Sequence, residues 1–116
     1  MEMVSINRTA IVVKPGQVFL DWLHSADPTS AHLSLKDLQD DPDVYLIPQC
    51  ESQDEVRKSL ASVCRHIFEE QLEGWWCEPS SWPKRRGLKT FDLWFEWSPH
   101  SMVNDLCPQA LLRQDF

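Results

Sequence analysis

Glycine is scarce in this sequence, and its scarcity excludes one common class of binding site. Only three glycines occur among 116 residues, so the chain has no glycine-rich loop that could cradle a phosphate group. Gly16 does stand between an expected strand and an expected helix, where phosphates bind in α/β folds. Val18 and Phe19, however, fill the positions where a phosphate cradle would lie. We therefore expect no nucleotide site and no cofactor.

Paired cysteines and long apolar runs are also missing. None of the four cysteines lies in a Cys-x-x-Cys pair, which argues against a zinc knuckle or a thioredoxin-like site. No apolar run approaches the roughly 20 residues that a membrane-spanning helix needs. The first residues lack the apolar core of a secretory signal. We therefore expect a cytoplasmic protein with reduced thiols and no membrane partner.

Basic residues are outnumbered, and they are unevenly distributed. Eleven Lys and Arg against 18 Asp and Glu give a formal net charge of −7, which makes nucleic acid an unlikely partner. The segment from Leu20 to Glu55 holds nine acidic residues and one lysine. A short basic patch comprises Lys84, Arg85 and Arg86, and its role stays open.

Tryptophan, by contrast, is abundant. The chain has six tryptophans and five phenylalanines, and each large aromatic side chain can bury roughly 150–250 Å². A compact core therefore needs no disulfide, and the length leaves room for one core only. We expect a single domain over residues 1–116, with residues 1–7 and 108–116 as loose termini.

A long amphipathic helix is the strongest structural signal. Ser52 and Glu55 have the spacing of a capping box at its start, and Gly74 is expected to break it at its end. Between them, apolar residues recur at steps of three and four, which predicts one apolar stripe. That stripe consists of Val56, Leu60, Val63, Cys64, Ile67, Phe68, Leu72 and Trp75.

Three other segments predict a small sheet. Thr9–Val13 and Asp43–Pro48 are β-branched or apolar runs bounded by turn residues, and alternation over Met102–Leu106 indicates a third strand. The continuous apolar run Val44–Ile47 is typical of an interior strand that is covered on both faces.

The expected strand direction follows from the connections. Short helices are predicted over Gln17–His24, after the capping residue Ser34, and over Leu88–Trp94. Because helices join the first two strands, we expect those strands to be parallel, with a right-handed crossover. The fold class is therefore predicted as α/β or α+β, a single small domain. Its sheet would have about three strands, mainly parallel, packed against one long and two or three short helices.

The chain also resembles a family of short bacterial proteins to which no activity is assigned. The resemblance spans most of the chain and implies a bacterial or phage origin, but no particular activity. The segments that carry it are Phe19–Leu23, Tyr45–Pro48, Ile67–Leu72, Trp82–Pro83 and His100–Val103.

The acidity and the aromatic residues together favour a protein-binding role. A carboxylate-rich surface suits an inhibitor or immunity-type protein that covers a basic active site or mimics nucleic-acid phosphates. Exposed tryptophan is characteristic of interface anchors, and so small a core cannot bury every ring. We expect an acidic binding module with a protein partner and no catalytic residue, and the oligomeric state stays open. The predicted binding residues are Asp37, Asp40, Asp41, Asp43, Trp75 and Trp76.

The alternative is a metal-dependent enzyme centred on the polar face of the long helix. His66, Glu69, Glu70 and Glu73 lie there, and residues four apart are neighbours on a helix. Di-metal carboxylate bundles use Glu-x-x-His on paired helices. Here the order is His-x-x-Glu, and no second helix carries a matching motif. These four residues are therefore a conditional metal site, in competition with a plain solvated helix face.

Overall fold

The fold is described from a computed structural model over residues 3–114. The loose termini predicted at residues 1–7 and 108–116 fall partly outside the described residues. The elements in chain order are β1 (Val4–Ser5), β2 (Arg8–Pro15), α1 (Gln17–Ala26), the 3₁₀ helix η1 (Pro28–Ser30), α2 (Leu35–Gln39), β3 (Asp43–Pro48), α3 (Gln53–Trp75), the 3₁₀ helix η2 (Pro79–Ser81), α4 (Leu88–Trp94), β4 (Phe95–His100) and β5 (Asn104–Asp105).

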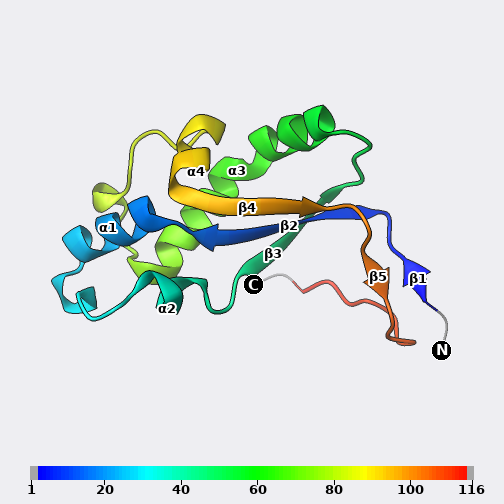
Figure 1. The fold of residues 1–116 in the computed structure, drawn as a ribbon, viewed down its shortest axis with the longest axis horizontal. Coiled ribbons are helices and arrows are strands. Elements are labelled where there is room, and N and C mark those ends of the chain that lie inside the picture. Colours follow the sequence, from blue (N-terminus) through cyan, green and yellow to red (C-terminus); the bar gives the residue numbers. More distant parts are fainter. Residues whose placement is uncertain (1–2, 115–116) are drawn as a thin grey trace.

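The prediction of a mainly parallel sheet is wrong. The main sheet has the order β3-β2-β4 (Figure 1), and β2 is antiparallel to both neighbours. The helices expected between β2 and β3 are present as α1 and α2, but they contact each other instead of crossing over the sheet. The chain therefore leaves β2 at one end of the sheet and returns to that same end to begin β3. Val13, near the end of β2, pairs with Asp43 at the start of β3. The fold is a small α+β arrangement with antiparallel strands.

Helix α3 then carries the chain back along the sheet. Its 23 residues span about 35 Å at 1.5 Å per residue. Consequently β4 runs in the same direction as β3, with β2 between them. Among residues 3–114, no helix is both long enough and apolar enough to cross a bilayer.

The register divides the sheet into a helix-covered face and an open face, because directly paired residues share a face. Ile11 pairs with Tyr45 on the covered face, and Val12 pairs with Val44 on the open face. The prediction that β3 is covered on both faces is therefore wrong. Val44 and Leu46 are 58% and 51% exposed, whereas Ile47 is 3% exposed.

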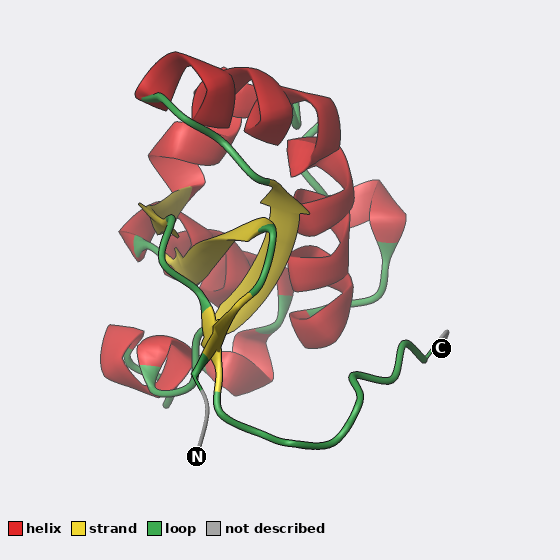
Figure 2. Cartoon of the chain, turned by 90° about the vertical axis from the view of Figure 1, so that its right-hand side faces the viewer, coloured by secondary structure: helices red, strands yellow, loops and turns green. Residues whose placement is uncertain are grey.

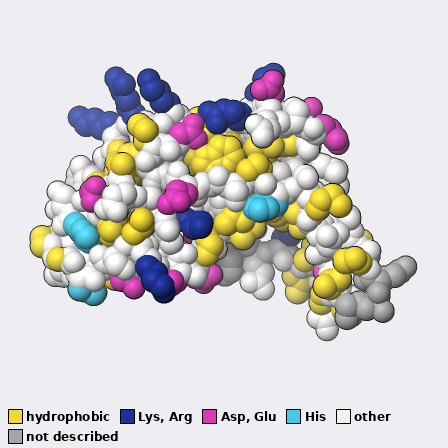
Figure 3. Space-filling model, in the orientation of Figure 1, with side chains coloured by type: hydrophobic (Ala, Val, Ile, Leu, Met, Phe, Trp, Pro, Cys, Tyr) yellow, Lys and Arg dark blue, Asp and Glu magenta, His cyan; other side chains and the backbone are white. Residues whose placement is uncertain are grey.

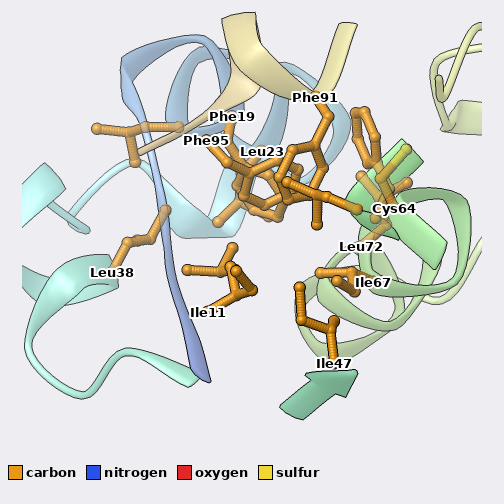
Figure 4. Packing of buried hydrophobic residues seen from close by; sticks show 14 of the residues in the cluster. Ile11, Phe19, Leu23, Leu38, Ile47, Cys64, Ile67, Leu72, Phe91 and Phe95 are labelled. Carbon is orange, nitrogen blue, oxygen red and sulfur yellow. The ribbon is translucent and has the colours of Figure 1, made fainter. Parts of the chain in front are cut away.

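Aromatic rings fill the space between the sheet and the helices (Figure 4). The ring of Phe68, on α3, lies 5.0 Å from the ring of Phe95 and 5.4 Å from that of Trp94, centroid to centroid. The apolar stripe predicted for α3 is confirmed, since most of its members are buried in this core. All six tryptophans are only partly buried and pack around the core.

Several element bounds differ from the prediction, since β2 spans Arg8–Pro15 and not only Thr9–Val13, and α1 continues past His24 to Ala26. Gly74 does not end α3, which continues to Trp75. The third strand of the main sheet is β4, directly after α4, and not the segment around Met102. Residues near Met102 instead lead into β5, which pairs with β1 as a separate two-stranded ribbon. Figure 2 shows the loop that follows this ribbon running clear of the helices.

Candidate functional site

The outer edge of β3 is one of the two outer edges of the main sheet in the described residues. In the described part of the chain, β3 pairs with β2 alone, so its other edge is free. Its segment Val44–Ile47 has no proline and no charged residue. Free edges of natural sheets are usually protected by charges, prolines or bulges. The other outer strand, β4, carries such residues in its interior, Glu96 and Pro99, whereas β3 has them only at its ends, as Asp43 and Pro48.

A groove of about 250 Å³ runs beside the free edge of β3, between this strand and α3. Val63 and Ile67 form its apolar helix side, and Ile47 contributes from the strand. Its remaining lining residues are Tyr45, Leu46, Pro48, His66 and Glu70. A free strand edge beside a helix groove is the arrangement in which domains accept an extended peptide as an added strand.

A hydrogen-bonded cluster joins β3 to α3 beside this groove. The hydroxyl of Tyr45 donates to Oε1 of Glu70 at 2.7 Å. The buried amide of Gln71 donates to that hydroxyl oxygen at 2.9 Å and also to the carboxylate of Asp43. Burial raises the pKa of Tyr45, and the hydrogen bond to Glu70 acts in the same direction. The cluster therefore fixes the spacing between the strand and the helix wall.

The four predicted binding aspartates lie at the end of the sheet where β3 begins, and two of them have structural roles. Asp37 completes a capping box with Ser34 at the start of α2. The backbone N–H of Ser34 donates to Asp37 at 2.8 Å, and this bond lowers the pKa of that carboxyl. Asp43 accepts from Gln71 as described above. Asp40 pairs with Lys36 at 3.2 Å on the surface, and Asp41 is exposed. Binding by these residues stays a prediction.

The two predicted tryptophan anchors are half-buried and lie where α3 ends. Both Trp75 and Trp76 pack against the core, and the backbone carbonyl of Trp76 accepts from the indole N–H of Trp82 at 2.9 Å. These contacts give both residues a structural role. The large exposed apolar side chains are aliphatic residues elsewhere in the chain.

The conditional metal site has no assembled ligand set. Glu69 pairs with Arg65 and Arg86, at 3.2 and 3.5 Å. Glu70 accepts from Tyr45, while His66 and Glu73 are exposed. Within residues 3–114, no three His, Cys, Asp or Glu side chains come together in a way that could hold a metal ion.

The basic patch contains one half-buried arginine and several exposed basic side chains. Arg86 lies over the ring of Trp82, with its guanidinium carbon 6.0 Å from the ring centroid, in the range of a cation–π contact. Lys84, Arg85 and Lys89 are exposed. Figure 3 shows Lys and Arg side chains gathered at the upper left, over α4 and the loop before it.

A larger hollow, of about 430 Å³, lies where α3 begins. Its polar groups already serve the local structure, because Thr9 accepts from the backbone N–H of Cys50 at 3.0 Å and Ser52 caps the helix. Acidic residues in the first turn of α3, Asp54 and Glu55, oppose the binding of an anion there. The hollow is therefore a weaker candidate than the groove beside β3.

Comparisons with protein-family models, with curated proteins and with solved structures find no match to this chain. The resemblance to short bacterial proteins therefore stays a prediction. Sequence reasoning missed the free edge of β3, although one signal was present. An uninterrupted apolar run such as Val44–Ile47 fits an unprotected edge as well as it fits an interior strand.

Proposed function

We propose that this protein is a binding module that takes up an extended segment of a partner protein along the free edge of β3. The proposal rests mainly on one observation about this edge. The segment Val44–Ile47 contains no charged residue or proline that would protect it, and it lies beside a mostly apolar groove. In such recognition, backbone hydrogen bonds supply affinity, and pockets for alternate side chains supply specificity. Val63 and Ile67 would receive apolar side chains of the added strand.

Charge indicates the class of partner. Asp43 and Glu70 are exposed beside the groove, and the whole chain carries a net charge of −7. A segment in which Lys or Arg alternates with apolar residues complements both the rim and the walls. This proposal retains the acidic, inhibitor-type or immunity-type role expected from the sequence, and moves the contact from the tryptophans to β3. Four free thiols support a cytoplasmic location.

The test is selection of binders from a random peptide library displayed against the purified protein. We expect the selected peptides to alternate apolar with basic residues and to shift the backbone amide resonances of Val44–Ile47. Leu46→Lys places a charge on the edge strand, at a side chain that is already 51% exposed. The affinity of this variant for the selected peptides should fall by about tenfold or more, because a lysine on an edge strand opposes pairing with another strand.

The matched control is Leu93→Lys, which adds the same charge at a leucine on α4 that is 67% exposed. Its affinity should equal that of the unaltered protein. Equal binding by the Leu46→Lys variant, or amide shifts confined to another surface, would refute the proposal. A library that yields no binder would also count against it.

A further inference from the structure

The segments before β2 and after β4 form a projecting arm, defined here as Met3–Asn7 with Ser101–Gln114. Within it, β1 pairs with β5 through Val4–Asp105 and Ser5–Asn104. The backbone N–H of Ile6 also donates to the carbonyl of Val103 at 2.9 Å. Strands of two residues make a ribbon too short to be stable in water without further contacts. The arm therefore needs a surface to pack against.

The arm exposes an unusual share of apolar side chains. Ten large apolar side chains of the described residues are exposed, and six of them belong to the arm. Met102 and Leu112 are 76% and 83% exposed, and no arm residue contributes to the buried core. Figure 3 shows the part of the arm around β1 and β5 at the lower right, where hydrophobic side chains lie on the surface. The six residues are Met3, Val4, Met102, Leu106, Leu111 and Leu112.

The chain also has more surface than a compact monomer of its mass. Its accessible area is 8328 Å², whereas a compact protein of 13.6 kDa is expected to expose about 6,600 Å². Its radius of gyration is 15.9 Å, against about 13 Å expected for 116 residues. The excess area of about 1,700 Å² is roughly twice the 800 Å² that each partner buries in a standard interface.

The distribution of charge restricts where a second copy of this chain can approach that surface. Two copies that each carry −7 repel each other over most of their surfaces. The described arm residues include one acid, Asp105, and one base, Arg113, so the arm is where two copies can approach with least repulsion. Met102 also lines the hollow at the start of α3, which gives an approaching copy a recess at the base of the arm.

We propose that the arm is a dimerisation surface, and that the arms of two copies pack against each other about a twofold axis. Such a contact uses the same patch on both chains and closes at two subunits. It does not involve the free edge of β3, so it is independent of the peptide-binding role. Each dimer would present two β3 edges.

The experiment is sedimentation equilibrium of the full chain over a range of concentrations. We expect a mass twice the 13.6 kDa of one chain. The double variant Leu111→Asp/Leu112→Asp changes two side chains that are 69% and 83% exposed, so its circular dichroism and melting temperature at low concentration should match those of the unaltered chain. Its dimer dissociation constant should rise by about tenfold or more, as expected when interface anchors are removed.

The control is Leu93→Asp, which places the same charge at an equally exposed leucine outside the arm and should leave the dimer unchanged. A chain that stays monomeric well above micromolar concentration would overturn the proposal. Equal dimerisation by the Leu111→Asp/Leu112→Asp variant would also overturn it. Co-sedimentation of a monomeric chain with neutral lipid vesicles would show instead that the arm meets a membrane surface.

Discussion

At the scale of single residues, Tyr45 connects the candidate groove to the stability of the fold. Its hydroxyl donates to Glu70 and accepts from Gln71, so one group links a strand residue to two helix residues. Burial, with the hydrogen bond to Glu70, raises its pKa above the ordinary value of about 10. Since this is the only tyrosine in the chain, its ionisation can be followed without overlap from other tyrosines.

The raised pKa of Tyr45 predicts the direction of a pH effect on stability. Above about pH 10, the unfolded chain releases the tyrosine proton while the folded chain retains it, so the free energy of unfolding should fall as pH rises. Tyr45→Phe should lower the free energy of unfolding by about 1–3 kcal/mol at neutral pH, the usual cost of the two hydrogen bonds that the hydroxyl makes. This difference should shrink above pH 10. Urea unfolding of both proteins across this pH range measures it.

The absorbance of tyrosinate in the folded protein gives an independent check. It should appear only at a pH above that of a free tyrosine. Titration at the ordinary value, or a stability difference between the two proteins that does not change with pH, would contradict the role given to Tyr45.

At the scale of elements, the junction between β2 and α1 depends on a close backbone approach at Gly16. Its N–H donates to the carbonyl of Trp94 at 2.8 Å, and a Cβ placed at this position would lie 3.1 Å from the same oxygen. This contact holds the start of α1 against the end of α4, where β4 begins. Because the neighbour is backbone, it cannot move aside as a flexible side chain would.

Replacing two glycines by alanine should therefore change stability in opposite directions. Gly16→Ala should lower the free energy of unfolding by about 1–3 kcal/mol, as overpacking does. Gly74 lies in α3 with no atom near its potential Cβ, so Gly74→Ala should raise it by about 0.5–1 kcal/mol through helix propensity. Denaturant unfolding of both variants measures the two changes. Equal effects of the two substitutions would show that the approach at Gly16 is not tight.

Local patterns predicted most of the elements correctly, because their signals lie within one segment. The stripe of α3, the helix caps at Ser34 and Ser52, and the bounds Asp43–Pro48 and Leu88–Trp94 all match the structure. Strand direction failed, because it depends on whether the helices between two strands cross the sheet or return to the same end. In the structure α1 and α2 contact each other and the chain returns to the same end of the sheet, an arrangement that neither segment encodes alone.

The candidate site was harder to predict than the elements. Charge and tryptophan content drew attention to Asp37 and Trp76, which the structure places in a helix cap and against the core. The groove depends instead on β3 lying at the edge of the sheet with α3 beside it, and both are tertiary facts. Residue types alone cannot distinguish an edge strand from an interior one when its apolar run is only four residues long.

At the scale of the whole molecule, the net charge of −7 favours binding at one proposed interface and opposes it at the other. A basic segment at the β3 groove is attracted by Asp43, Glu70 and the overall charge, whereas two copies that meet at their arms repel each other at longer range. Salt screens both effects, with a Debye length of about 10 Å at 0.1 M. A change in ionic strength should therefore alter the affinities at the two surfaces differently, so the two can be distinguished without any mutation.

Raising the salt concentration from about 0.05 to 0.5 M should weaken peptide binding and leave dimerisation unchanged or tighter. The two dissociation constants can be measured on the same samples, by fluorescence anisotropy of a labelled basic peptide and by sedimentation. Glu70→Gln removes one carboxylate from the rim of the groove, so it should reduce the salt dependence of peptide binding and leave that of the dimer unchanged. If salt weakened both equilibria alike, the arm contact would itself be electrostatic, and the low charge of the arm could not explain the choice of a second copy as its partner.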